Sequence, residues 1–227
     1  MVRSSRSAIV AVAVVGAGVV LAACSGGSGR TTTTNTPSPT RSTPAAVEQP
    51  AQVAVSASEL GAGWQQRLIP GGSQVQGEVT LDLCGGDYRS EALRTARHQI
   101  AFRLGRLQLS NEVVRYAPGG AQLAYAELKK RLSTCPKTPV TMPEAGGIRA
   151  RWMLARLPND PSWPRDTVAV RGTVTAQGHT STSIGIYEFD GQWLAAVYTQ
   201  DATSASLRVA ERMATIEATK LRAATGH

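Results

Sequence analysis

The sequence is short of aromatic residues, of acidic residues and of recognisable catalytic motifs. Aromatic side chains make up 5% of the 227 residues and charged side chains 18%. With 42% hydrophobic residues, the composition excludes a chain that is disordered throughout and indicates a globular core with appendages. There is no G-x-S-x-G, H-E-x-x-H, phosphate-loop or dinucleotide-binding motif. The sequence therefore predicts no catalytic residue, no cofactor, no metal site and a protein that is not an enzyme.

Isolated titratable residues do not change this prediction. His98 falls on an expected strand and His179 in an expected turn, where a lone histidine is more often an ordinary surface or core residue than a base or metal ligand. Glu188 and Asp190 are close enough in sequence to act as paired carboxylates. We interpret them instead as solvated residues at a strand end and a turn.

The first residues are typical of a bacterial export signal, predicted over 1–23. Arg3 and Arg6 precede the uncharged run 8–23, which at 1.5 Å per residue spans about 24 Å, short of a hydrocarbon core of about 30 Å. The segment ends in Leu21-Ala22-Ala23-Cys24, which resembles the lipobox of bacterial lipoproteins. The resemblance implies lipidation of Cys24 with a diacylglyceryl group and an N-acyl chain such as palmitate. The alternative is an ordinary secreted protein in which Cys24 is incidental.

Residues 24–50 are expected to form the lipidated cysteine and a disordered tether. From residue 25 onwards this segment holds seven Thr, four Ser, four Pro and three Gly and no aromatic residue, too little apolar surface to offset the entropy of ordering. A flexible coil of this length spans roughly 30 Å. Residues 51–227 then form one extracytoplasmic domain, held by its lipid anchor on the outer face of the cell membrane.

Basic residues exceed acidic ones, with 24 Lys and Arg against 16 Asp and Glu. An exported protein does not meet cytoplasmic DNA, and the basic residues are scattered along the chain, so we predict no nucleic-acid partner. Anionic lipid head groups or cell-wall polymers match the surplus better.

Cys84 and Cys135, which remain once Cys24 is lipidated, are expected to form a structural disulfide, since exported domains favour such bonds. Cys135 continues a stripe of apolar residues that recurs every three or four positions in a helix predicted over 119–135. Cys84 follows the strand-like run 79–83. The bond would close a loop of about 50 residues and contribute on the order of 4 kcal/mol. A metal or redox pair is the alternative, but no C-x-x-C motif or neighbouring histidine supports it.

The rest of the domain is patterned as strands followed by one long helix. Asp190-Gly191 is typical of a two-residue hairpin turn, which would pair Tyr187 with Leu194 and make both faces of the hairpin apolar. The helix is expected over 202–223, with Asp201 as its N-cap. The fold class is therefore α+β, an antiparallel sheet of about five to seven strands with packed helices. Further strands are expected over 98–102, 107–116, 148–157 and 167–176.

A hairpin that is apolar on both faces is either covered twice or leaves one face for a ligand. Trp163 also lies within 158–164, a run of turn-forming residues, where it either closes over a groove or plugs a sheet edge. Cover on both faces and a plug are the commoner arrangements. The candidates for a ligand face are the aromatic residues Trp152, Trp163, Tyr187, Trp193 and Tyr198.

Several short motifs resemble one family. They are Glu59-Leu60-Gly61-Ala62-Gly63-Trp64, Leu83-Cys84-Gly85, Ser110-Asn111-Glu112-Val113-Val114-Arg115-Tyr116 and Thr134-Cys135-Pro136. Over roughly residues 52–222 the chain resembles exported actinobacterial lipoproteins with a PknH-like domain, the extracellular sensor domain of a mycobacterial serine/threonine kinase. The resemblance implies an α+β domain with a cleft for an unidentified ligand. The kinase sensors carry two disulfides and follow a transmembrane helix, whereas this chain has one candidate pair and a lipid.

We therefore expect a lipid-anchored extracytoplasmic binding or sensor-like module for a small or lipidic envelope ligand. The alternative is a non-catalytic interaction subunit of a cell-envelope complex, whose partner is an envelope protein. A cell-wall enzyme is a third hypothesis, which no motif supports. A retained ligand would favour the first hypothesis, and a stoichiometric protein partner the second.

Overall fold

The computed structural model describes residues 49–142 and 147–226. The predicted signal peptide, the lipidation site Cys24 and all but the last two residues of the predicted tether lie outside the described residues. The first helix, α1, begins at Pro50, and the Pro50 side chain is buried. The folded part of the chain therefore includes the last residue that the composition assigns to the tether.

The described residues form an α+β domain, as expected. Its strands pair antiparallel in one eight-stranded sheet of order β1-β2-β3-β8-β7-β6-β5-β4. The helices are α1 (Pro50–Val53), α2 (Ala57–Leu60), α3 (Gly120–Thr134) and α4 (Ser204–Thr225), and two 3-10 turns span Leu83–Gly85 and Arg89–Leu93. The strands are β1 (Gln65–Leu68), β2 (Arg94–Leu104), β3 (Leu107–Tyr116), β4 (Val140–Met142), β5 (Ile148–Arg156), β6 (Asp166–Ala176), β7 (His179–Asp190) and β8 (Trp193–Thr199).

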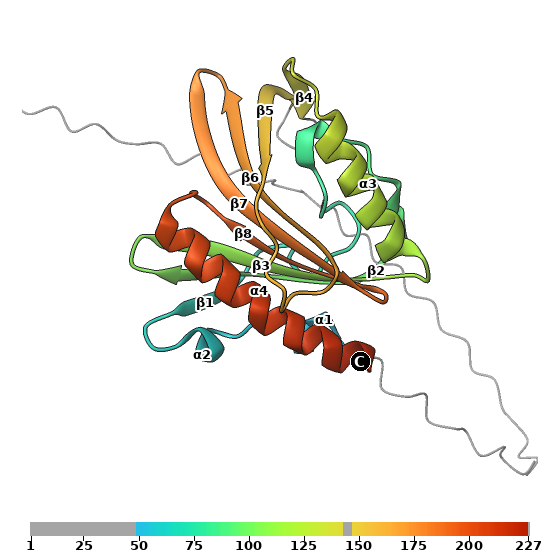
Figure 1. The fold of residues 1–227 in the computed structure, drawn as a ribbon, viewed down its shortest axis with the longest axis vertical. Helices are drawn as coiled ribbons and strands as arrows, with labels where there is room; N and C mark the ends of the chain where they lie inside the picture. The colour runs from blue at the N-terminus through green and yellow to red at the C-terminus, as the bar shows by residue number, and fades with distance from the viewer. Residues whose placement is uncertain (1–48, 143–146, 227) are drawn as a thin grey trace, which may run out of the picture. The chain divides into compact units, whose positions relative to one another are not determined.

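Helices cover both faces of the centre of the sheet (Figure 1). On the α4 side, α4 and α1 pack over β3, β7 and β8, and the core there includes Phe102, Ile186 and Met213. On the α3 side, α3 packs over β3 and β7, and the core includes Tyr116 and Leu128. The expectation that a hairpin apolar on both faces is covered twice is confirmed.

The helices follow from their sequence patterns. In α3, the buried residues Ala121, Ala124 and Leu128 recur at helical spacing, which confirms the predicted buried stripe. The N-cap of α4 is Thr203, whose Oγ1 accepts a hydrogen bond from Ser206 N at 3.1 Å. Asp201, predicted as the N-cap, lies two residues earlier and accepts from Thr203 N at 3.3 Å.

The predicted strand count was too low, because two short edge strands were missed. One expected strand, over 79–83, does not form. β1 and β4 have four and three residues, and β1 is exposed throughout. Neither strand is long enough for its pattern to be recognised in the sequence. The run 79–83 is irregular. Thr80 N and Leu81 N donate to the Glu91 carboxylate, at 2.9 Å and 3.2 Å, rather than to a neighbouring strand.

The hairpin between β7 and β8 forms where it was predicted, but its register is shifted by two residues. Phe189 pairs with Leu194 and Asp190 with Trp193, so the loop is Gly191-Gln192. Gly191 has a φ of 56°, as a glycine at the first position of a tight hairpin loop does. A shift of two residues keeps each side chain on its predicted face, which explains why the prediction for both faces held.

The disulfide between Cys84 and Cys135 is present, with a Cα–Cα distance of 5.6 Å. It joins the first 3-10 turn to the residue that ends α3. Cys84 is fully buried. The bond holds α3 against the segment that precedes β2, which is the structural role expected from the sequence.

Candidate binding pocket

The five aromatic residues predicted as a ligand face do not share one face. Trp163 and Trp193 belong to the core on the α4 side. Tyr187 belongs to the core on the α3 side, and Trp152 and Tyr198 pack against it. Of the five, Tyr187 and Tyr198 contact each other edge-on, with ring centroids 5.4 Å apart. Because each face has its own cover, no single ligand face unites them.

Trp163 plugs the core on the α4 side. Its side chain is 6% exposed, and its Nε1 donates to Thr215 Oγ1 of α4 at 3.2 Å. The loop around it is fastened to the same helix, because the Arg222 guanidinium donates to Ser162 O at 2.9 Å. The structure therefore favours the plug over the groove cover.

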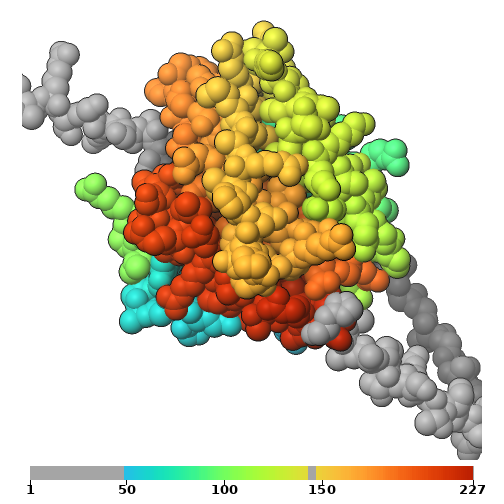
Figure 2. Space-filling model, in the orientation of Figure 1, coloured from blue at the N-terminus to red at the C-terminus, as the bar shows by residue number. Residues whose placement is uncertain are grey.

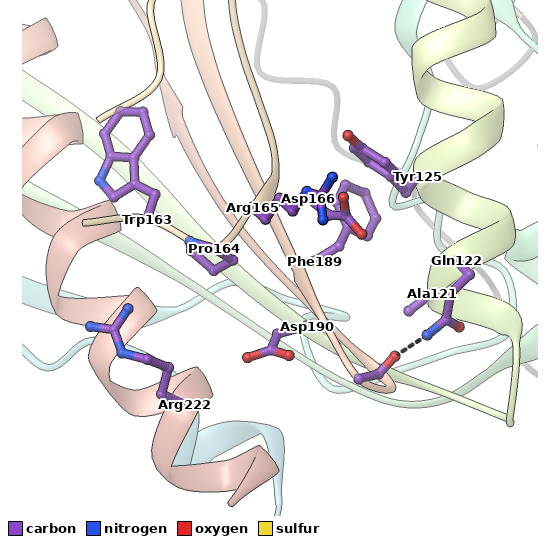
Figure 3. Close-up of a pocket in the computed structure, with 11 residues that line it drawn as sticks. Ala121, Gln122, Tyr125, Trp163, Pro164, Arg165, Asp166, Phe189, Asp190 and Arg222 are labelled. Atoms are coloured by element: carbon purple, nitrogen blue, oxygen red, sulfur yellow. Dashed lines mark hydrogen bonds between the residues drawn. The ribbon is translucent and has the colours of Figure 1, made fainter. Parts of the chain in front are cut away.

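A pocket of about 350 Å³ lies beside this loop (Figure 3). It is built by four segments that are far apart in sequence: the start of α3, residues 163–166, the β7–β8 hairpin and the end of α4. Its lining residues are Ala121, Gln122, Tyr125, Trp163, Pro164, Arg165, Asp166, Phe189, Asp190, Gly191 and Arg222.

Aromatic rings form one wall of the pocket. The rings of Tyr125 and Phe189 are tilted against each other, with centroids 5.4 Å apart, and Lys129 Nζ lies 4.8 Å from the Tyr125 centroid. Gln122 Nε2 donates to Gly191 O at 2.8 Å, which ties α3 to the hairpin turn (Figure 3). The wall is thus fixed from both the helix and the sheet.

Four charged side chains complete the lining. Arg165 and Asp166 are exposed, and their side chains make no hydrogen bond or ion pair with the described residues. Asp190 accepts from Thr225 Oγ1 at 3.1 Å. The two guanidinium groups, of Arg165 and Arg222, present planar sets of donors that suit carboxylate or phosphate oxygens. The arrangement can bind a small molecule that carries an anionic group and a ring or apolar part.

The pocket lining contains the carboxylates of Asp166 and Asp190 and the phenol of Tyr125, but no histidine, cysteine, serine, threonine or lysine.

Two glutamates are buried on the α4 side, where the sequence suggested only a solvated pair. Glu188 of β7 and Glu217 of α4 are both fully buried. Glu217 Oε1 accepts a hydrogen bond from Asn111 Nδ2, while Glu217 Oε2 and both oxygens of Glu188 have no partner among the described residues. Glu188 was predicted to be solvated near Asp190, and that prediction was wrong because α4 covers its strand.

Burial governs the ionisation of this carboxyl pair. It raises the pKa of Glu217 to about 8, against the hydrogen bond from Asn111 and the charge of Lys220, which lower it. The pKa of Glu188 is raised well above its usual value by burial and then by Glu217, and is lowered by Arg222. Burial therefore favours the neutral form of both carboxyls in the folded protein.

A second buried polar cluster lies on the α3 side. Arg97 Nε and Glu112 Oε1 form an ion pair at 2.5 Å, with both side chains 2% exposed. Glu112 also accepts from Thr80 Oγ1 at 2.7 Å and from Gln99 Nε2 at 3.3 Å. Arg97 donates further to Gly71 O at 3.1 Å. These contacts fasten the segment that precedes β2 across the sheet, so we assign them a structural role.

The two histidines noted in the sequence lie apart from the pocket. His98 is half-buried on β2, and burial lowers its pKa. His179 is exposed at the start of β7. Within residues 49–142 and 147–226, no group of three or more His, Cys, Asp or Glu is placed to hold a metal ion. In the same residues no helix is long and apolar enough to cross a membrane.

No family model matches the chain, and no curated protein matches it. Among solved structures, the extracellular domain of PknH from Mycobacterium tuberculosis is similar at 15% sequence identity and a TM-score of 0.46. The alignment covers 77% of this chain and 97% of that domain. The family resemblance predicted from short motifs is thus matched only by a distant structural similarity. This similarity carries no functional inference.

The pocket was not predicted, because sequence spacing does not bring its four segments together. Of the five predicted aromatic residues only Trp163 lines it. The buried carboxyl of Glu217 did have a sequence signal. It lies four residues after Met213 and four before Leu221, in the same stripe of α4.

Proposed function

We propose that this chain is a lipid-anchored extracytoplasmic binding or sensor-like module that holds a small envelope molecule in the pocket between α3 and α4. The ligand carries an anionic group for Arg165 or Arg222 and a ring or apolar part for the Tyr125–Phe189 wall. A volume of about 350 Å³ is near the lower limit for small-molecule sites, so the proposal favours a compact polar ligand over a lipid.

The observation that carries the proposal is the convergence of exposed charge and aromatic surface at one hollow. Arg165 and Asp166 have no side-chain partner among the described residues, yet they sit at a position fixed by the plug residue Trp163. A sensor-like role fits because the lining joins α3, on one face of the sheet, to α4, on the other. A ligand that bridges these helices would couple the two faces.

Native mass spectrometry of the chain purified from its own envelope tests the proposal. We expect a retained compound of defined mass in the wild type, and its loss in the Arg165→Gln, Arg222→Gln double variant. The control is Arg208→Gln, Arg106→Gln, which removes two exposed arginines outside the pocket and should keep the compound. A uniformly empty wild type, with one envelope protein bound at equal stoichiometry, would instead favour an interaction subunit.

A further inference from the structure

An exposed basic surface lies on the part of the sheet that α4 does not cover. β5, β6 and β7 continue beyond α4 in Figure 1, and in Figure 2 their residues, in yellow and orange, form the surface beside that helix. The register places Ala155 opposite Arg171, Met153 opposite Thr173 and Arg151 opposite Thr175. Because residues two apart share a face, Arg149 lies on this face as well.

The face is the outer, α4 side of the sheet. Arg171 pairs with Ile184 of β7, which belongs to the core under α4, so the side chains of this row point to the α4 side. Arg149, Arg151, Met153 and Arg171 are all exposed. A shift of one residue in strand register would separate Arg149 and Arg151 from Arg171, and the observed register places all three on one face.

The charge of this surface is of one sign. β5 contains no Asp or Glu, and neither do residues 171–176 of β6 or 179–184 of β7. The arginines have threonine neighbours, Thr173 and Thr175 on β6 and Thr180 and Thr182 on β7. Arginine side chains and hydroxyl groups together form a donor-rich surface suited to phosphate oxygens.

Met153 distinguishes a lipid surface from a soluble polyanion as the partner. Its side chain is 61% exposed, and it lies between the rows of Arg151 and Arg171. A thioether in the middle of a basic sheet face gains nothing from a hydrated polymer. It gains by entering the boundary between head groups and acyl chains, while the flanking cations contact the phosphates.

We propose that this face, made of Arg149, Arg151, Met153 and Arg171, binds the anionic head-group surface of a phospholipid membrane. The proposal does not depend on a ligand in the pocket, nor on lipidation of Cys24. The lipid anchor and this basic face would act together. Surface arginines near an anionic bilayer add to the binding of an anchor that alone fixes only the distance of the domain from the membrane.

The test is co-sedimentation of the full chain carrying Cys24→Ser with vesicles of phosphatidylcholine, with and without phosphatidylglycerol. Each surface arginine contributes about fivefold to partitioning, so Arg149→Gln, Arg151→Gln, Arg171→Gln should lower the phosphatidylglycerol-dependent partition coefficient roughly a hundredfold. The control replaces Arg89, Arg106 and Arg208, which are exposed elsewhere, with glutamine. It therefore has the same net charge as the triple variant. It should retain most of the binding.

A second variant and a soluble competitor complete the test. Met153→Ser should weaken vesicle binding several-fold and leave binding to a soluble polyphosphate unchanged. Equal losses in the triple variant and its control would overturn the proposal, because binding would then follow net charge alone. Binding to polyphosphate without phosphatidylglycerol-dependent sedimentation would also overturn it and assign the face to a cell-wall polymer.

Discussion

The buried pair Glu188 and Glu217 predicts an unusual pH dependence of stability. In the unfolded chain a glutamate ionises near pH 4.5, whereas burial raises the pKa of Glu217 to about 8 in the fold. Between these values the folded state holds a proton that the unfolded state has lost. The stability that this group contributes is therefore complete below pH 4.5 and is lost as the pH rises towards 8.

The expected change is large enough to measure. One such group lowers the free energy of unfolding by about 1.4 kcal/mol per pH unit, or about 3 kcal/mol between pH 5 and pH 7. Glu188, whose pKa is raised in the same direction, adds to this loss. Glu217→Gln keeps the acceptor for Asn111 Nδ2 and removes the titration. The variant should match the wild type near pH 4.5 and exceed it by about 4 kcal/mol near pH 8.

Urea denaturation of the wild type and Glu217→Gln from pH 4.5 to pH 8 measures this effect. Glu211→Gln, an exposed change on the same helix, is the matched control. His98, whose pKa is lowered by burial, acts with the opposite sign, because it favours folding as the pH rises through its unfolded value. That contribution is common to all three proteins and cancels in their differences. Parallel pH profiles for the wild type and Glu217→Gln would refute the reasoning.

Three further results are expected. Replacing Cys84 and Cys135 with serine should lower the free energy of unfolding by about 4 kcal/mol, measured by denaturation; a loss under about 1 kcal/mol would contradict a structural disulfide. Metabolic labelling with a fatty acid should tag the wild type and not Cys24→Ser, and a label kept by the variant would refute lipidation. Trp163→Ala should destabilise the fold by about 3 to 5 kcal/mol as a core plug, whereas a groove cover would leave thermal unfolding nearly unchanged.

The sequence predicted features that depend on local periodicity and missed those that depend on length or on distant contacts. The stripe of α3 and the two apolar faces of the β7–β8 hairpin follow from spacings of three or four and of two. The hairpin register was wrong by two residues because the Asp190-Gly191 signal marks the turn without fixing which residues close it. Asp190 closes the last pair with Trp193, and Gly191 opens the loop.

The edge strands and the buried carboxyls were missed for physical reasons. β1 and β4 are too short and too exposed to show a pattern, and they exist because a longer neighbour offers free backbone groups. The run 79–83 alternates like a strand, but the Glu91 carboxylate takes its backbone donors. Glu217 sits in an apolar stripe that a count of hydrophobic residues alone passes over. The pocket has no local signal at all, because only the tertiary fold brings its four segments together.

The proposed location and the proposed binding rest on different parts of the chain. Location rests on the residues around Cys24, outside the described part of the chain, while binding rests on the pocket. Lipidation and ligand binding can therefore be refuted independently. An unlipidated protein with an occupied pocket would still be a binding module, whereas a lipidated protein with an empty pocket would not be one. The absence of an enzymatic role stays a prediction.

The most direct test of the central claim is a crystal structure of the protein purified from its own envelope, without added ligand. The account predicts density for a compact molecule against the Tyr125–Phe189 wall, with an anionic group within hydrogen-bond distance of Arg165 or Arg222. A pocket that holds only water in such crystals, with Arg165 and Asp166 paired to each other across it, would contradict the claim.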